Sequence, residues 1–183
     1  MKLRKGWFNI PGVQAGDRTV QDQMKGLDAL ELQASGKTVL DLGCAEGLVA
    51  RQLVQAGAQV HGVEVVRDAV LEARKQCPEG EFYHVDLNVP HALKELQLPP
   101  IDVVLALAVL HKLRNPLQVV RTFLSFNPAL VVLRMPPATP GFVLDRRSGM
   151  KKHDVAGALD PTHALVYTTR GHFDEWVGYF ERR

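Results

Sequence analysis

The sequence predicts an α/β fold: a doubly wound, mostly parallel sheet of seven strands with helices on both faces and an antiparallel strand at the C-terminal end. Two observations support this prediction. Five short apolar runs alternate with four helical patterns, and the link between two further strand-like stretches, 164–169 and 176–181, is short enough for antiparallel pairing. The apolar runs lie near residues 38–42, 59–64, 82–86, 103–109 and 129–134, and the helical patterns lie near 47–57, 67–76, 90–97 and 116–125.

Length and composition agree with a single globular domain. The chain has 183 residues, of which 46% are hydrophobic, and a formal net charge of +2. No run of about 18 or more apolar residues is present, and the basic N-terminus lacks the apolar core of a signal peptide. The spacing of the two cysteines, Cys44 and Cys77, suggests neither a metal site nor a disulfide framework. We therefore expect a cytoplasmic protein with reduced thiols, no bound metal and no membrane contact.

The most informative segment is 39–47, where the first apolar run ends and a helical pattern begins. It contains an acid, Asp41, followed by Gly43 and Gly47. Glycine lets the backbone approach a ligand closely, and a helix N-terminus offers free N–H groups and a positive dipole end. The pattern D-x-G-x-A-x-G differs from the dinucleotide fingerprint G-x-G-x-x-G, and a carboxylate suits an ammonium better than a pyrophosphate. A tight turn without a ligand is the alternative.

With this loop the sequence resembles the class I S-adenosylmethionine (SAM)-dependent methyltransferase family. The first motif of that family is a D/E-x-G-x-G-x-G loop around the methionine part of SAM, and Ala45 stands where the family has its middle glycine. The resemblance covers about residues 37–181, more strongly in the first half. It implies a Rossmann-like fold, SAM as the cofactor, and a cofactor loop made of Asp41, Gly43, Cys44, Ala45 and Gly47.

Acidic residues also follow the next two predicted strands. Glu64 ends the second apolar run, about 20 residues after the loop, where an acid can accept hydrogen bonds from ribose hydroxyls. The resemblance implies that Glu64 binds the ribose, that Asp86 lies near the adenine amine, and that Leu87 packs on the ring. It also places Leu107, at the end of the fourth run, in the cofactor site. Each acid alone could be an ordinary surface carboxylate.

The basic residues are unevenly distributed. Residues 111–153 contain eight basic residues and one acid, for a charge of +7, which leaves 14 basic and 19 acidic residues, or −5, elsewhere. In the resembled fold this segment borders the substrate pocket, so a basic rim there would favour an anionic substrate. Lys112, Arg134 and the aromatic Trp7 are therefore assigned to the substrate. Arg134 could bind a carboxylate or phosphate, or equally be the structural partner of a nearby acid. A solvated surface is the alternative for the whole segment.

Methyl transfer from a sulfonium is an in-line displacement, so the protein mainly positions the nucleophile and removes its proton where needed. His111 follows the fourth predicted strand and its side chain titrates near neutral pH, which makes it the candidate base. The stretch 108–116 resembles the V-L-H-H-L-x-D-P segment of many small-molecule methyltransferases, although Lys112 replaces the second histidine. A structural histidine is the alternative. No N/D-P-P-Y motif or cysteine nucleophile of DNA-methylating enzymes follows the fourth strand.

The resemblance also implies two parts: an N-terminal cap segment, 1–36, and a methyltransferase domain, 37–183. In the cap, Thr19 is expected to begin a helix as its N-cap, and Trp7 and Phe8 either cover SAM or pack the segment onto the core.

We therefore predict a SAM-dependent methyltransferase acting on an oxygen or nitrogen atom of a small acceptor, with an anionic one favoured. Three alternatives stay open. The chain could bind SAM without transferase activity, as a partner subunit or sensor, or methylate RNA, although no nucleic-acid motif is present. An NAD-type enzyme is disfavoured by the glycine spacing, by Asp41 and by the terminal strand pair. The sequence does not indicate an oligomeric state.

Overall fold

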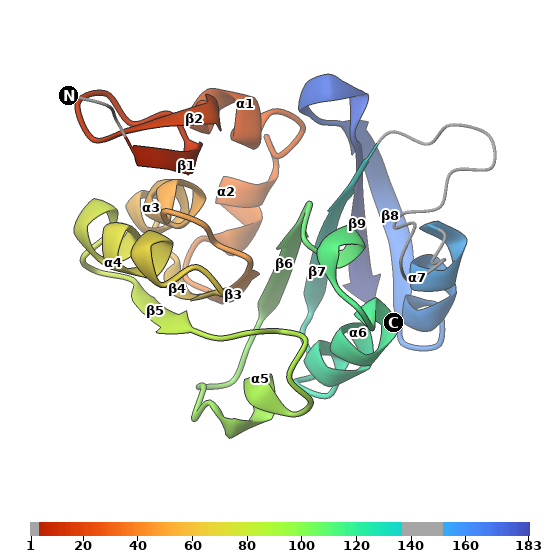
Figure 1. The fold of residues 1–183 in the computed structure, drawn as a ribbon. Coiled ribbons are helices and arrows are strands. Elements are labelled where there is room, and N and C mark those ends of the chain that lie inside the picture. Colours follow the sequence, from red (N-terminus) through yellow and green to blue (C-terminus); the bar gives the residue numbers. More distant parts are fainter. Residues whose placement is uncertain (1–3, 137–151) are drawn as a thin grey trace.

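The computed structural model describes residues 4–136 and 152–183, and its centre is a sheet with helices on both faces (Figure 1). The seven strands of this sheet are β3 (Thr38–Leu42), β4 (Gln59–Glu64), β5 (Glu81–His84), β6 (Val103–Leu107), β7 (Leu130–Met135), β8 (His163–Arg170) and β9 (Trp176–Arg182). Their spatial order is β5-β4-β3-β6-β7-β9-β8. All neighbours from β5 to β7 are parallel, and β9 runs antiparallel to both β7 and β8. The predicted fold class is confirmed.

The strands divide their side chains between two hydrophobic clusters, because successive residues of a strand point to opposite faces of the sheet. In β3, Val39 belongs to one cluster and Leu40 to the other. In β6, Leu105 and Val104 divide in the same way. This explains why the central strands are continuous apolar runs in the sequence: both of their faces are covered by helices.

Seven helices are described, and they cover the two faces of the sheet unequally (Figure 1). They are α1 (Val20–Met24), α2 (Leu30–Ala34), α3 (Leu48–Gln55), α4 (Arg67–Gln76), α5 (Ala92–Glu95), α6 (Pro116–Leu124) and α7 (Lys152–Leu159). The first four pack on one face and the last three on the other. The expected cap of α1 is present, since Thr19 and Asp22 form a reciprocal capping box.

The N-terminal segment contains a separate two-stranded unit, β1 (Arg4–Phe8) and β2 (Gln14–Arg18), which lies beside α3 (Figure 1). The sequence analysis predicts no strands in this part of the cap segment. The backbones of the two strands approach closely: a Cβ atom at Gly16 would lie 2.1 Å from the carbonyl carbon of Phe8. Phe8 itself is buried in the core, so the packing expected for it is found.

The helix α7 has no counterpart among the helical patterns predicted from the sequence. Its Val155 and Leu159 are fully buried in the cluster that also holds Phe123 of α6. Two apolar residues four positions apart are too few to form a convincing helical pattern in the sequence. Within the described ranges, no helix is both long and apolar enough to cross a membrane.

Candidate functional site

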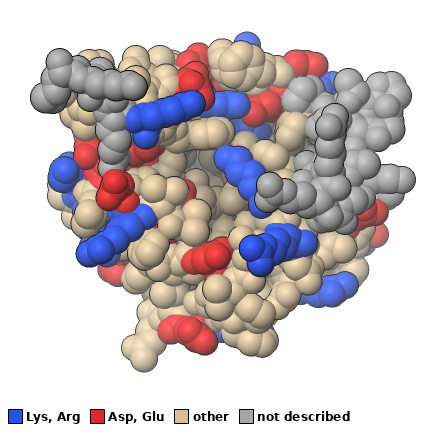
Figure 2. Space-filling model, viewed as in Figure 1, with Lys and Arg blue, Asp and Glu red and all other residues tan. Residues whose placement is uncertain are grey.

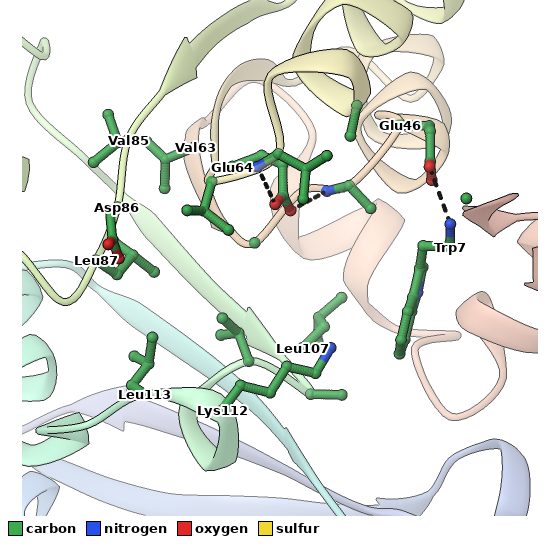
Figure 3. Close-up of a pocket in the computed structure, with 18 of the residues that line it drawn as sticks. Trp7, Glu46, Val63, Glu64, Val85, Asp86, Leu87, Leu107, Lys112 and Leu113 are labelled. Carbon is green, nitrogen blue, oxygen red and sulfur yellow. Dashed lines mark hydrogen bonds between the residues drawn. The ribbon is translucent and has the colours of Figure 1, made fainter. Parts of the chain in front are cut away.

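A cavity of about 590 Å³ opens beyond the carboxyl ends of the central strands, which is the edge where open α/β sheets bind ligands. The segments that follow β3, β4, β5 and β6 form most of its wall, and residues of β1 and β2 close one side. Asp86 and Leu87 lie on one side of the cavity and Trp7 on the opposite side, with Glu64 between them (Figure 3). Eight of the residues assigned from the sequence line the wall: Trp7, Gly43, Ala45, Glu64, Asp86, Leu87, Leu107 and Lys112.

The loop between β3 and α3 depends on backbone conformations that favour glycine. Gly43 has φ +76°, and a Cβ atom there would lie 2.9 Å from Cγ2 of Val109 across the cavity wall. Gly47, the N-cap of α3, has φ +73°, and its Cβ would lie 2.9 Å from Cβ of Ala73 in α4. Gly43 therefore keeps the cavity open, whereas Gly47 lets two helices approach.

Ala45 is the residue that replaces the family's middle glycine, and it also adopts a left-handed conformation, with φ +49°. A non-glycine residue there costs about 1–2 kcal/mol. One compensating contact is a hydrogen bond from the Ala45 N–H to Glu64 Oε2, at 3.2 Å. Ala45 thus adopts the left-handed conformation that a glycine would favour, and its hydrogen bond to Glu64 helps to stabilise it.

The Glu64 carboxylate connects the loop to the end of β4. Oε2 accepts from Ala45 and Oε1 accepts from the N–H of Val66, at 2.9 Å (Figure 3). Two backbone donors fix its orientation in the wall, and each oxygen keeps further acceptor capacity. Glu64 can therefore accept from a diol such as a ribose while still holding the loop.

Asp41 lies beneath this loop and outside the cavity wall, with only 3% of its surface exposed. Burial, and secondarily the nearby charge of Glu64, raises the pKa of Asp41 to about 7. A positive charge in the cavity would favour the ionised form of Asp41 through the low-dielectric interior. Cys44 is also buried outside the wall, and burial raises the pKa of its thiol well above the ordinary value.

At the opposite end, Asp86 is held by Asn88. The Asp86 carboxylate accepts from the backbone N–H of Asn88 at 2.8 Å and from its side-chain amide at 2.9 Å, and these hydrogen bonds lower the pKa of Asp86. Leu87 and Val85 extend the apolar surface beside it (Figure 3). This arrangement offers an apolar surface next to a fixed carboxylate, which is a suitable environment for an adenine.

The sequence missed Glu46, the residue that attaches the N-terminal strands to the loop. It is 2% exposed, and its two carboxylate oxygens accept from the backbone N–H groups of Trp7 and Phe8, at 3.0 and 3.1 Å. A Cβ atom at Gly6 would lie 2.5 Å from Glu46 Oε1, so a side chain there would disrupt this contact. Glu46 is an acid between two glycines, but its partners are 38 and 39 residues away and no local pattern indicates them.

Contacts fix the side chain of Trp7 as well as its backbone, because two cations lie against its ring. Lys112 Nζ lies 4.0 Å from the centroid of the Trp7 ring, and the guanidinium of Arg18 lies 5.1 Å from it. Arg18 is in turn fixed by a bidentate, buried ion pair with Glu175, at 2.8 and 3.1 Å. Burial lowers the pKa of Lys112. Trp7 packs against the core cluster and also lines the cavity, so the packing role is found, whereas covering SAM stays a prediction.

Two further residues assigned from the sequence, Arg134 and His111, also lie outside the wall. Arg134 is 1% exposed, lies outside the wall, pairs with Glu175 at 3.6 Å and donates to the carbonyl of Lys25 at 2.9 Å. Burial lowers the pKa of Arg134 to about 10. The structural-partner alternative therefore describes Arg134. His111, in the 3-10 helix Leu110–Lys112, is half-buried and also outside the wall.

The wall is more acidic than the sequence suggests. It contains five acids and two lysines, Lys5 and Lys112, and of the basic segment 111–153 only Lys112 contributes among the described residues. Arg146, Arg147 and Lys151 lie outside the described residues. On the surface, Lys and Arg side chains border a hollow with Asp and Glu among them (Figure 2). An acidic wall suits a ligand with a net positive charge, such as a sulfonium with an ammonium group.

Comparisons with known proteins agree with this geometry. A family model described as "Methyltransferase domain" matches residues 18–177. The ubiquinone biosynthesis O-methyltransferase of Maricaulis maris is 35% identical over 85 residues, covering 44% of this chain and 32% of that protein. The tRNA U34 carboxymethyltransferase of Pseudomonas aeruginosa is 32% identical over 120 residues, covering 62% of this chain and 36% of that protein. The chain thus spans about a third of the length of these relatives.

Solved structures share the fold at low sequence identity. Magnesium protoporphyrin IX methyltransferase from Synechocystis PCC 6803, crystallised with bound S-adenosylhomocysteine (SAH), has a TM-score of 0.69 and 22% identity, covering 89% of this chain and 84% of that one. A SAM-dependent methyltransferase from Aquifex aeolicus has a TM-score of 0.68 and 14% identity, covering 91% and 95%. The family match, together with neighbours crystallised with SAM and SAH, supports SAM as the cofactor. The chain belongs to the class I SAM-dependent methyltransferases.

Proposed function

We propose that this protein transfers the methyl group of SAM to an oxygen or nitrogen atom of a small acceptor bound between Trp7 and Lys112. The observation that carries the proposal is the order of groups along the cavity: an apolar surface with Asp86 at one end, Glu64 in the middle, and an aromatic ring with a cation at the other end. SAM has the same sequence of parts, with adenine, ribose and a charged methionine portion.

The residues of the wall suit SAM in the following way. Asp86 and Leu87 would hold the adenine, Glu64 the ribose hydroxyls, and the loop Gly43–Gly47 the methionine portion. Gly43 supports this assignment, because a side chain there would enter the space beside Val109. The acidic wall and buried Asp41 would stabilise the positive charges of SAM. When bound, SAM supplies an electrophilic methyl group on a positively charged sulfur.

The protein's own contribution is to position the acceptor and exclude water. Residues 1–36 act as a cap in this proposal, since Trp7, Lys5 and Asp17 of β1 and β2 close the acceptor end. His111 is not needed as a base, because it lies outside the wall. Attack by an already ionised acceptor would require orientation rather than proton removal.

A small acceptor is favoured over RNA. The relatives include proteins named for ubiquinone biosynthesis and for tRNA modification, so both classes occur among similar sequences. Phosphate backbones require several exposed cations, whereas five acids and two lysines line this cavity.

The test is transfer of a labelled methyl group from SAM. Purified protein is incubated with methyl-labelled SAM and, in parallel, with a panel of small phenols, carboxylic acids and amines, and with total tRNA. Label in a small acceptor, dependent on Trp7, supports the proposal. Label in tRNA alone would contradict the small-acceptor assignment, and tight SAM binding without any transfer would favour a partner subunit or sensor.

A further inference from the structure

We propose that Lys112 binds the negatively charged oxygen atom that receives the methyl group, so that the acceptor is an acidic hydroxyl or carboxyl compound and the enzyme an O-methyltransferase. This inference rests on the proposed function and specifies its acceptor. It follows from how the charged groups around the Trp7 end of the cavity are already paired.

Two lysines line this end of the cavity, Lys5 and Lys112, and the ammonium of Lys112 is the one that the structure fixes in place, with capacity left for a ligand. It lies over the Trp7 ring, and no carboxylate or carbonyl of the described residues pairs with it. An ammonium has three donors, and the face of an aromatic ring uses none of them fully. Arg18, in contrast, already donates hydrogen bonds to the carboxylate of Glu175 and to the side-chain oxygen of Gln23.

Glu64 and Glu175, the acids whose charges act on Lys112, already have partners, and so does Glu46. Glu64 accepts from two backbone N–H groups, and Glu46 accepts from those of Trp7 and Phe8. Glu175 is shared by Arg18 and Arg134. Glu64, Arg18 and Glu175 are the charged groups whose fields act on Lys112, and none of them is its hydrogen-bond partner.

Trp7 makes the position of Lys112 well defined. The Trp7 backbone is fixed by Glu46, and its ring lies against Arg18, which cannot move without breaking a buried ion pair. The Lys112 ammonium lies over this fixed ring. Lys112 and Leu107 line the same part of the cavity (Figure 3). The Lys112 ammonium is therefore preorganised beside the Trp7 ring, which lies on the opposite side of the cavity from Asp86.

The chemistry then selects the acceptor. An acidic hydroxyl loses its proton to solvent on binding beside an ammonium, and its oxygen becomes the nucleophile. One electron pair of that oxygen forms the new O–C bond while the C–S bond breaks and its electrons stay on sulfur, so an anion and a sulfonium become two neutral groups. An amine acceptor would bind as a cation and be repelled by Lys112. No general base is required, in agreement with the position of His111 outside the wall.

The test uses 4-nitrophenol, whose absorbance reports its ionisation directly. The SAH-saturated protein is mixed with 4-nitrophenol, and the pKa of the bound phenol is read from absorbance across a pH series. We expect the bound pKa to fall by about one unit, a tenfold preference for the phenolate, in the wild type and in Lys112→Arg. Lys112→Met should abolish the shift, and benzoate but not benzylamine should displace the probe.

Arg121→Met, which removes an exposed charge on α6 outside the cavity wall, is the matched control and should retain the shift. An unchanged pKa in the wild type, a shift that survives in Lys112→Met, or failure of the probe to bind would overturn the inference. SAH binding, measured by calorimetry on the same samples, keeps this result separate from the proposed function. Wild-type protein that binds SAH without preferring the phenolate contradicts the role of Lys112 alone, whereas protein that does not bind SAH contradicts the proposed function itself.

Discussion

The carboxylate of Glu46, in the cofactor loop, accepts a hydrogen bond from the backbone N–H of Trp7, 39 residues earlier in the chain, at 3.0 Å. This contact joins the two halves of the proposed site, because Glu46 belongs to the loop that would hold methionine and Trp7 forms the acceptor end. Loop and N-terminal strands should therefore respond together to a change at either one.

Glu46→Ala tests this coupling. It leaves two backbone donors without their acceptor, which should cost about 1–3 kcal/mol for each one that remains buried. We expect weaker SAH binding and a changed fluorescence of Trp7, both measured on the same preparation. Glu31→Gln, at an exposed position of α2, is the control and should change neither. A variant with wild-type SAH affinity would show that the strands and the loop act independently.

Gly43→Ala and Gly12→Ala form a matched pair. Their φ angles are +76° and +74°, so both substitutions carry the same backbone penalty of about 1–2 kcal/mol. Only at Gly43 does the new Cβ meet another group, Cγ2 of Val109 at 2.9 Å, whereas at Gly12 nothing lies within 4 Å. Calorimetry should show loss of SAH affinity in the Gly43 variant alone. Equal losses would mean that the Gly43 position does not shape the cofactor site.

Asp41 should make stability depend on pH. Its folded pKa of about 7 lies above the ordinary value of 3.8, so the native state holds a proton that the unfolded state releases between these values. The free energy of unfolding should therefore fall as the pH rises from about 4 to about 7, by up to about 4 kcal/mol.

The substitution Asp41→Asn removes this titration. Urea denaturation should show that the variant is more stable than the wild type at about pH 8 and not at about pH 4, while its affinity for SAM decreases through loss of the negative charge. Identical pH dependence in both proteins would contradict the raised pKa. Stability gained together with unchanged SAM affinity would contradict the role of Asp41 in the cofactor site.

Glu175 is the shared partner of two buried arginines, Arg18 and Arg134. Glu175→Gln removes their counter-charge and should lower the free energy of unfolding by about 3–5 kcal/mol, because it leaves buried charges uncompensated. The exposed pair of Asp160 and Arg183 provides the comparison: Asp160→Asn should cost at most about 1 kcal/mol in the same urea titration. Similar losses in the two variants would show that the buried pair is not structurally important.

The parts of the fold and site that follow strand order were predictable from the sequence. Gly43, Glu64 and Asp86 each lie at or just after the end of an apolar run, and parallel strands bring such positions to one edge of the sheet. The residues that escaped prediction depend on contacts between distant segments. Glu46 is defined by its bonds to β1, and α7 by two buried side chains rather than by a pattern.

Arg134 was predicted to line the cavity, but its contacts with distant segments place its side chain elsewhere. Its place at the end of β7 suggested the cavity, but side chains of a strand alternate between faces, and that of Arg134 reaches the carbonyl of Lys25 and the carboxylate of Glu175. Position along a strand gave the correct edge of the sheet, whereas the destination of the side chain depended on partners 109 and 41 residues away in the sequence.

The most direct measurement is calorimetric titration of the cofactor-free protein with SAM, SAH and NAD in parallel. We expect SAM and SAH to bind with micromolar affinity, corresponding to about −8 kcal/mol, and NAD to give no signal. Glu64→Ala should weaken SAH binding by about 1–3 kcal/mol through loss of charge-assisted hydrogen bonds to the ribose. Absence of SAM and SAH binding, or equal binding in Glu64→Ala, would contradict the assignment of this cavity as the SAM site.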